Sequence, residues 1–67
     1  MKLKLNFIEE TEKARLFEMP KLGHIWIPRS VIKTQRKFPE VNGKTVCVVE
    51  VEDWFVRRNK VLEKCEV

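Results

Sequence analysis

The sequence predicts a small, mainly β domain with one C-terminal helix, and three observations support this class. Apolar and polar residues alternate with a period of two over residues 2–7, as in a half-buried strand. Asn42-Gly43 separates two strand-like runs, which is typical of a tight hairpin. The apolar period becomes helical only after residue 52. Because short strands must curl to bury one face, we expect a strongly bent antiparallel sheet or a partly open SH3-like or OB-like barrel.

The first three strands are expected at residues 2–8, 14–19 and 23–28 of a single domain that spans residues 1–67. A polar turn, EETEK, separates the first two, and Pro20 ends the second because proline cannot donate to a β-ladder. In the third strand, Ile25 and Ile27 share one face, while His24 and Trp26 share the other.

The remaining two strands are expected at residues 31–38 and 44–51, joined by a two-residue type I′ turn at Asn42-Gly43. This turn would pair Val41 with Lys44, and would place Phe38 opposite Cys47 and Arg36 opposite Val49. Lys37 and Gln35 would lie on the other face, opposite Val48 and Glu50. Pro39 indicates that the first arm is an edge strand, is bulged, or is ordered only near the turn.

A helix is expected at residues 53–62, with Asp53 as its N-cap and a fraying tail after it. Trp54, Phe55, Val61 and Leu62 fall on one face of this helix, which predicts that they reach the core.

Composition limits the class of protein. The chain has 67 residues, of which 43% are hydrophobic and 36% charged, which excludes a membrane span and a disordered polyelectrolyte. A core of this size supplies only about 3–5 kcal/mol of net stability.

A disulfide between Cys47 and Cys65 is possible by count, but Cys47 resembles a buried strand residue. The start of the chain lacks the apolar stretch of a signal peptide. We therefore expect free thiols and a cytoplasmic location, in the host cytoplasm if the protein is viral.

Neither catalysis nor a metal or other cofactor is expected. One histidine and two cysteines, without Cys-x-x-Cys spacing, cannot build a four-ligand zinc site. No nucleophile elbow, P-loop or dinucleotide fingerprint is present, and nothing in the sequence marks a partner for His24.

The charge distribution favours nucleic acid as the partner. The net charge is +4, and residues 20–44 carry six cations against Glu40 alone. Small β-barrels bind single strands with basic grooves and aromatic platforms. The candidate nucleic-acid-binding residues are Trp26, Arg29, Lys33, Arg36, Lys37 and Lys44. The alternative for Trp26 is that both tryptophans meet inside the barrel.

A protein partner is the other candidate. A small sheet with an edge strand can form a homodimer or add a strand to another protein, for example as an inhibitor of a host protein. Arg57 and Arg58 are of the type enriched at interface hot spots.

The segments KARLFEM, GHIWIPRSVI and VEVEDWFVRRNKVL resemble a pattern in small phage and mobile-element proteins, in which K-A-x-L-F/V precedes W-I/L-P-K/R-S-x-I and a later tryptophan opens a short basic helix. The most specific element of the resemblance is WIPRSVI at residues 26–32. No settled activity is attached to that group, so the resemblance implies a prokaryotic or viral accessory protein rather than a reaction. The basic segment KTQRKFPEVNGKT is longer here than in the pattern.

Overall fold

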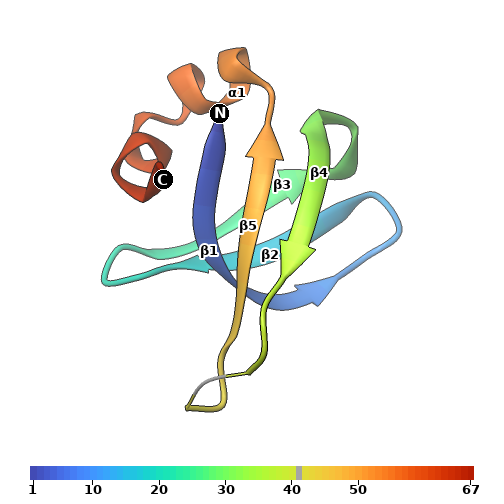
Figure 1. The fold of residues 1–67 in the computed structure, drawn as a ribbon. Helices are drawn as coiled ribbons and strands as arrows, with labels where there is room; N and C mark the ends of the chain where they lie inside the picture. Colours follow the sequence, from blue (N-terminus) through green and yellow to red (C-terminus); the bar gives the residue numbers. More distant parts are fainter. Residues whose placement is uncertain (41) are drawn as a thin grey trace.

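Five antiparallel strands form one open sheet in the order β3-β2-β1-β5-β4, with a short helix near the C-terminus, in a computed structural model that describes residues 1–40 and 42–67 (Figure 1). The strands are β1 (Lys2–Glu10), β2 (Ala14–Met19), β3 (Gly23–Pro28), β4 (Ile32–Lys37) and β5 (Thr45–Val51). The 3₁₀ turn η1 (Arg29–Val31) connects the two edge strands, β3 and β4. The predicted mainly β class is therefore confirmed.

β1 is the strand that bends the sheet. Its residues 2–7 pair with β5 and its residues 6–10 pair with β2. The register shifts between Phe7 and Glu9, so that Ile8 is an extra residue at a β-bulge, and bulges increase strand bending. The hairpin of β2 and β3 consequently crosses behind β5 and β4 (Figure 1). Glu9 and Glu10 belong to β1, so the predicted polar turn begins later than expected.

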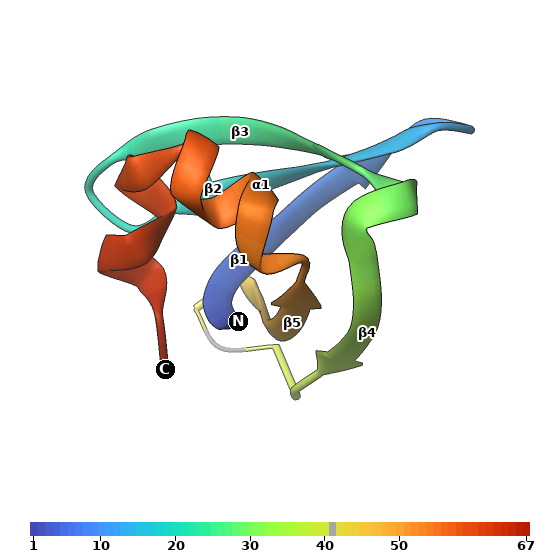
Figure 2. The ribbon, with the colours of Figure 1, turned by 90° about the horizontal axis from the view of Figure 1, so that it is seen from above.

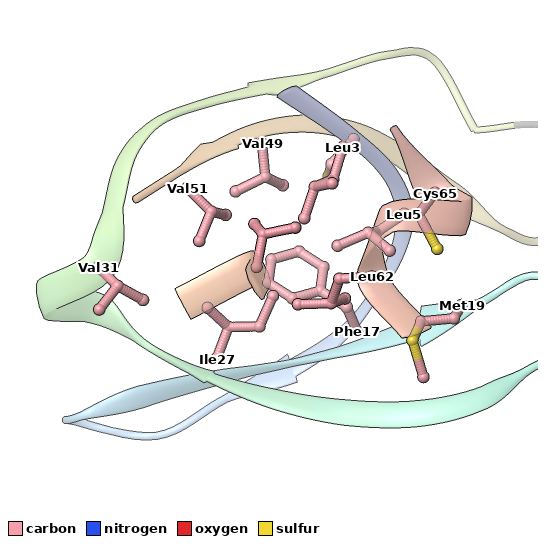
Figure 3. Packing of buried hydrophobic residues seen from close by; sticks show 12 residues of the cluster. Leu3, Leu5, Phe17, Met19, Ile27, Val31, Val49, Val51, Leu62 and Cys65 are labelled. Atoms are coloured by element: carbon pink, nitrogen blue, oxygen red, sulfur yellow. The ribbon is translucent and has the colours of Figure 1, made fainter. Parts of the chain in front are cut away.

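The core lies between the two halves of the bent sheet, and side chains from β1, β2, β3, β5 and the C-terminal segments point into it (Figure 3). Phe17 is its largest fully buried side chain. The buried residues of the cluster are Leu3, Leu5, Phe17, Met19, Ile27, Val31, Cys47, Val49, Val51, Val56, Leu62 and Cys65. The alternation in residues 2–7 thus places Leu3 and Leu5 inside, as predicted.

The C-terminal helix is shorter than predicted. α1 (Asp53–Arg58) is followed by its C-cap, Asn59, whose side-chain amide donates to the Phe55 carbonyl at 3.0 Å. Such local bonds compete with the helical ladder, and Asn59 leaves the helical region with φ −116° and ψ 70°. The chain continues as the 3₁₀ helix η2 (Lys60–Cys65). Viewed from above, α1 and η2 lie over the space that the bent sheet encloses (Figure 2).

This change of helix type determines which side chains reach the core. In a 3₁₀ helix, residues three apart share a face, and Leu62 and Cys65 are both buried. Val61 is exposed, and Trp54, predicted to be core, is 53% exposed, so both expectations were wrong.

The two ends of the predicted helical segment also differ from expectation. Glu52 occupies the N-cap position without a side-chain capping bond. Asp53 is instead the first helical residue, and its carboxylate accepts a hydrogen bond from the Met1 ammonium at 2.9 Å. The tail does not fray, because Glu66 pairs with Leu3 and the Val67 N–H donates to the Lys2 carbonyl at 2.9 Å.

The long hairpin keeps its predicted turn but not its predicted register. Asn42 and Gly43 both have positive φ, 53° and 74°, as a type I′ turn requires. Lys37, however, pairs with Cys47, where Phe38 was expected. The Phe38 N–H donates to the Val46 carbonyl, after which residues 38–40 leave the strand. The predicted Val41–Lys44 pair lies outside the described residues.

Pro39 explains where the ladder stops, because proline has no N–H to contribute. It follows β4, which is an edge strand, the first of the three alternatives predicted for this arm. Residue 31, predicted to begin this strand, lies in η1, and a second register shift makes Lys33 the extra residue between Ile32 and Thr34.

No helix within residues 1–40 and 42–67 combines the length and apolar character needed to cross a membrane.

Candidate nucleic-acid interface

The one-residue shift in register exchanges the two faces of β4. Gln35 and Lys37 pair with Val49 and Cys47, so they share the face of the core. Arg36 pairs with Val48 on the opposite, outer face. Because side chains alternate along a strand, a one-residue slip moves each of them to the other face. The predicted basic hairpin is therefore divided between two surfaces.

The first surface is a hollow on the outer face of the sheet, which we call the outer groove. Lys4, Val48 and Arg36 follow one another across β1, β5 and β4 in a single row. The hollow beside this row has a volume of about 380 Å³ and is lined by Lys4, Phe38, Pro39, Val46, Val48 and Val67. Its floor is apolar. The cation Lys4 lines it, and the cation Arg36 lies beside it in the same row.

Phe38 is the aromatic side chain of the outer groove. It is 40% exposed, and the Arg36 guanidinium carbon lies 5.4 Å from the centre of its ring. This distance permits a cation–π interaction. The pair places a flat ring and a positive charge side by side on one surface, which is a combination that can bind a base and its phosphate.

A second hollow of about 350 Å³ shares Lys4 and Val67 with the outer groove. It extends past the turn between β2 and β3, and its other lining residues are Pro20, Leu22, Lys64, Cys65 and Glu66. Lys64 adds a third cation and Glu66 adds one acid. Together the two hollows run from the β4 edge over the start of β1.

Three of the predicted cations are paired with carboxylates. Arg29 lies 2.6 Å from Glu10, measured from Nη2 to Oε2. The Nζ atoms of Lys33 and Lys44 each lie 3.2 Å from a carboxylate oxygen, of Glu52 and Glu18 respectively.

These pairs remain accessible to a competing anion. All three cations are at least two-fifths exposed in their side chains, and exposed ion pairs contribute little to stability. The Glu52 carboxylate raises the pKa of Lys33, so this lysine stays charged at neutral pH. The pairs lower the basic potential of the hairpin, but a phosphate can displace their carboxylates.

Trp26 lies on the outer face, but away from the groove. It is 45% exposed and sits on the edge strand β3 opposite Leu16. Neither tryptophan is buried, so the alternative in which both meet inside the barrel is wrong. β2 and β1 separate Trp26 from β5, and Glu18 lies on the outer face of β2 between them.

Lys37 belongs to the second surface, a polar hollow on the inner face, which we call the mouth. It has a volume of about 210 Å³ and is lined by Phe7, Glu10, Arg15, Gln35 and Lys37. The Lys37 ammonium lies 4.8 Å from the centre of the Phe7 ring. Arg15 donates through Nε to Glu10 at 3.1 Å and through Nη1 to the Gln35 carbonyl oxygen.

Arg57 and Arg58, predicted as interaction residues, are exposed in the last turn of α1. They lie three and four residues after Trp54, and residues at these spacings share a helix face. The Trp54 ring packs edge-on against Phe55, at 5.8 Å between ring centres. α1 therefore presents one tryptophan and two arginines to solvent.

The two cysteines are free and buried. Burial raises the pKa of both thiols, so both are protonated at neutral pH and neither supplies a thiolate nucleophile.

Sequence reasoning identified Arg36 but missed Lys4 and Phe38 as its companions. The period of two in residues 2–7 already placed Lys4 on the outer face, and that signal was sufficient to find it. Phe38 was assigned to the wrong face by the predicted register. Arg15 and Gln35 could not be found from spacing, because the bend of the sheet brings β2 and β4 together at the mouth.

Comparisons with protein-family models, with curated proteins and with solved structures find no match to this chain.

Proposed function

We propose that the protein is a non-catalytic accessory protein of a phage or similar mobile element, and that it binds single-stranded nucleic acid in the outer groove. One observation carries the binding proposal: Lys4 and the exposed Phe38 ring line one apolar hollow, and the Arg36 guanidinium lies against that ring. Proteins that bind single strands combine cations for the backbone with aromatic rings for the bases. The resemblance at residues 26–32 supports the mobile-element setting.

Each side chain has a distinct role in this proposal. A base stacks on Phe38, while Arg36 and Lys4 contact the phosphates on either side of it. Val46 and Val48 form an apolar floor that favours an unpaired base over the sugar-phosphate backbone. Lys33, Lys44 and Arg29 act at longer range, after their carboxylates are displaced, and Trp26 offers a further stacking position on the same face.

The test is binding of a fluorescent oligonucleotide, measured by polarisation with single-stranded DNA, single-stranded RNA and duplex DNA. We expect Lys4→Gln with Arg36→Gln to weaken single-strand binding about tenfold at low salt, because two phosphate contacts are lost. Phe38→Ala should also cost about tenfold, since stacking contributes about 1–3 kcal/mol per base.

Two matched controls accompany these variants. Lys13→Gln with Lys60→Gln removes the same charge from exposed positions outside the groove, and Trp54→Ala removes an exposed aromatic ring from α1. Equal losses in the groove variants and in their controls, or no binding by the unmodified protein, would contradict the proposal.

A second candidate function, a protein-interaction module, is favoured by the exposed face of α1. Tryptophan and arginine are the residues most enriched at interface hot spots, and Trp54, Arg57 and Arg58 share this face. If the partner is a second copy of the chain, we expect light scattering to give twice the chain mass and Trp54→Ala to restore the monomer. A monomer at every concentration would rule out the homodimer.

A further inference from the structure

We propose that the mouth is a binding site for one phosphate group. This inference is independent of the outer groove, because the mouth lies on the inner face of the sheet and shares no lining residue with the groove. The ligand class is a phosphate monoester or diester, either on a small molecule or in a nucleic acid.

The first argument is charge. Two cations, Arg15 and Lys37, line the mouth, and Glu10 is the one carboxylate among its described lining residues. Arg29 lies outside this lining and binds Glu10 as well. A single oxygen of Glu10, Oε2, accepts from both arginines, at 3.1 Å and 2.6 Å. The lining of the mouth therefore carries one positive charge in excess, and Arg29 beside it adds a second. In a hollow with a protein wall, such an excess attracts an anion more strongly than the same charges do in open water.

The second argument is donor geometry. A guanidinium carries five N–H donors, and the two contacts of Arg15 use Nε and Nη1, so further donors remain for an anion. Lys37 provides three donors, and its ammonium is positioned over the Phe7 ring. Arginine together with lysine is a common combination for phosphate, because one offers a planar fork and the other a mobile point charge.

The third argument is that hydrogen bonds to neighbouring side chains hold the donors of the mouth in place. The Gln35 carbonyl oxygen accepts from Arg15, and its amide contacts the Cys47 sulfur at 3.7 Å. Cys47 is fully buried in the core. The Arg15 side chain, 26% exposed, is held by Glu10 on one side and by Gln35 on the other. The donors are thereby oriented before a ligand arrives, which lowers the entropic cost of binding.

The test uses inorganic phosphate in a chloride buffer, followed by amide and side-chain NMR shifts. We expect saturable shifts centred on Arg15, Gln35 and Lys37. Gln35→Glu is nearly isosteric and adds a carboxylate beside Arg15, so the fold should persist while phosphate affinity falls about tenfold or more. Glu10→Gln removes the opposing charge and should raise the affinity. Lys37→Gln should weaken binding, and Lys60→Gln, on η2, is the control.

The source of the phosphate is distinguished by two oligonucleotides of one sequence, with and without a 5′-phosphate. Tighter binding of the phosphorylated strand, lost in Gln35→Glu, assigns the mouth to nucleic-acid ends. Equal binding, with inorganic phosphate still saturating, assigns it to a small phosphorylated ligand. Lys4→Gln with Arg36→Gln should leave phosphate binding intact, which separates this site from the groove. Shifts that do not saturate, or that Gln35→Glu leaves unchanged, would overturn the proposal.

Discussion

At the scale of single residues, Glu18 shows how neighbours control the charge of the outer face. The Asn6 amide donates to its carboxylate at 3.0 Å, and the Lys44 ammonium lies 3.2 Å from the same oxygen. These two contacts, in that order of importance, hold the pKa of Glu18 below its ordinary value of 4.5. The carboxylate is therefore charged at the neutral pH at which nucleic acid would be bound, and it competes with phosphate for Lys44.

This lowered pKa predicts a specific dependence of stability on pH. A carboxylate with a depressed pKa in the folded state stabilises the fold above its unfolded pKa, and this contribution is lost as the pH falls through the folded value. Glu18→Gln should therefore lower the midpoint of urea unfolding slightly at pH 7, and the difference from the unmodified protein should shrink well below pH 4.5. The effect is small because the pair is exposed.

The control for this measurement is Glu12→Gln, in the exposed turn after β1. It should leave the midpoint unchanged at both pH values. A difference between Glu18→Gln and the unmodified protein that is the same at pH 7 and in acid would contradict the assigned roles of Asn6 and Lys44.

At the scale of elements, local signals predicted the strands well and the long hairpin only in part. Alternation located β1 and β3, because each buries one face, and Pro20 marked the end of β2. The Asn42-Gly43 turn could also be predicted from a local signal, because these two residue types accept the positive φ that a type I′ turn requires. The predicted register differs from the observed one by one residue. Pro39, next to the turn, allows one residue of this arm to leave the ladder, and the apolar pattern of the sequence contains no sign of that change.

The prediction of one continuous helix in the C-terminal segment was wrong for a related reason. A helical period assumes one helix type, and Asn59 changes the type in mid-segment. After that change, spacing of three rather than four selects the buried side chains, so Leu62 stays in the core and Val61 turns outward.

This pair of neighbours gives a direct test of the packing. Leu62 is fully buried and Val61 is 37% exposed. Leu62→Ala should destabilise the fold by about 2–5 kcal/mol, because it removes buried methyl groups and leaves a cavity. Val61→Ala should change the free energy of unfolding by less than about 1 kcal/mol. Comparable losses in both variants, by urea unfolding, would mean that η2 does not pack as described.

At the scale of the whole molecule, the bend at Ile8 separates the two candidate sites and brings together the residues of the mouth. It folds the sheet over its own core, which leaves an outer face with the groove and an inner end with the mouth. The sequence allowed the bend to be expected, since short strands must curl, but not its position. The partners across the mouth, Arg15 and Gln35, are 20 residues apart and meet only because of it.

Charge is likewise organised over the whole molecule. The net charge of +4 was visible from composition, but its distribution was not. Carboxylates on other elements pair with Arg29, Lys33 and Lys44, while Arg36 and Lys37 lie against aromatic rings on opposite faces. The positive charge of the hairpin is thus divided between two faces of the sheet rather than gathered on one.

The proposed nucleic-acid function is tested by the salt dependence of single-strand binding in the unmodified protein and in Lys4→Gln with Arg36→Gln. We expect log K to fall linearly with log salt, and the double variant to reduce the slope by about 1.4, since each phosphate contact on a single strand contributes about 0.7. The Lys13→Gln with Lys60→Gln control should keep the original slope. An unchanged slope in the groove variant, or the absence of salt-dependent binding, would contradict the assignment of the outer groove.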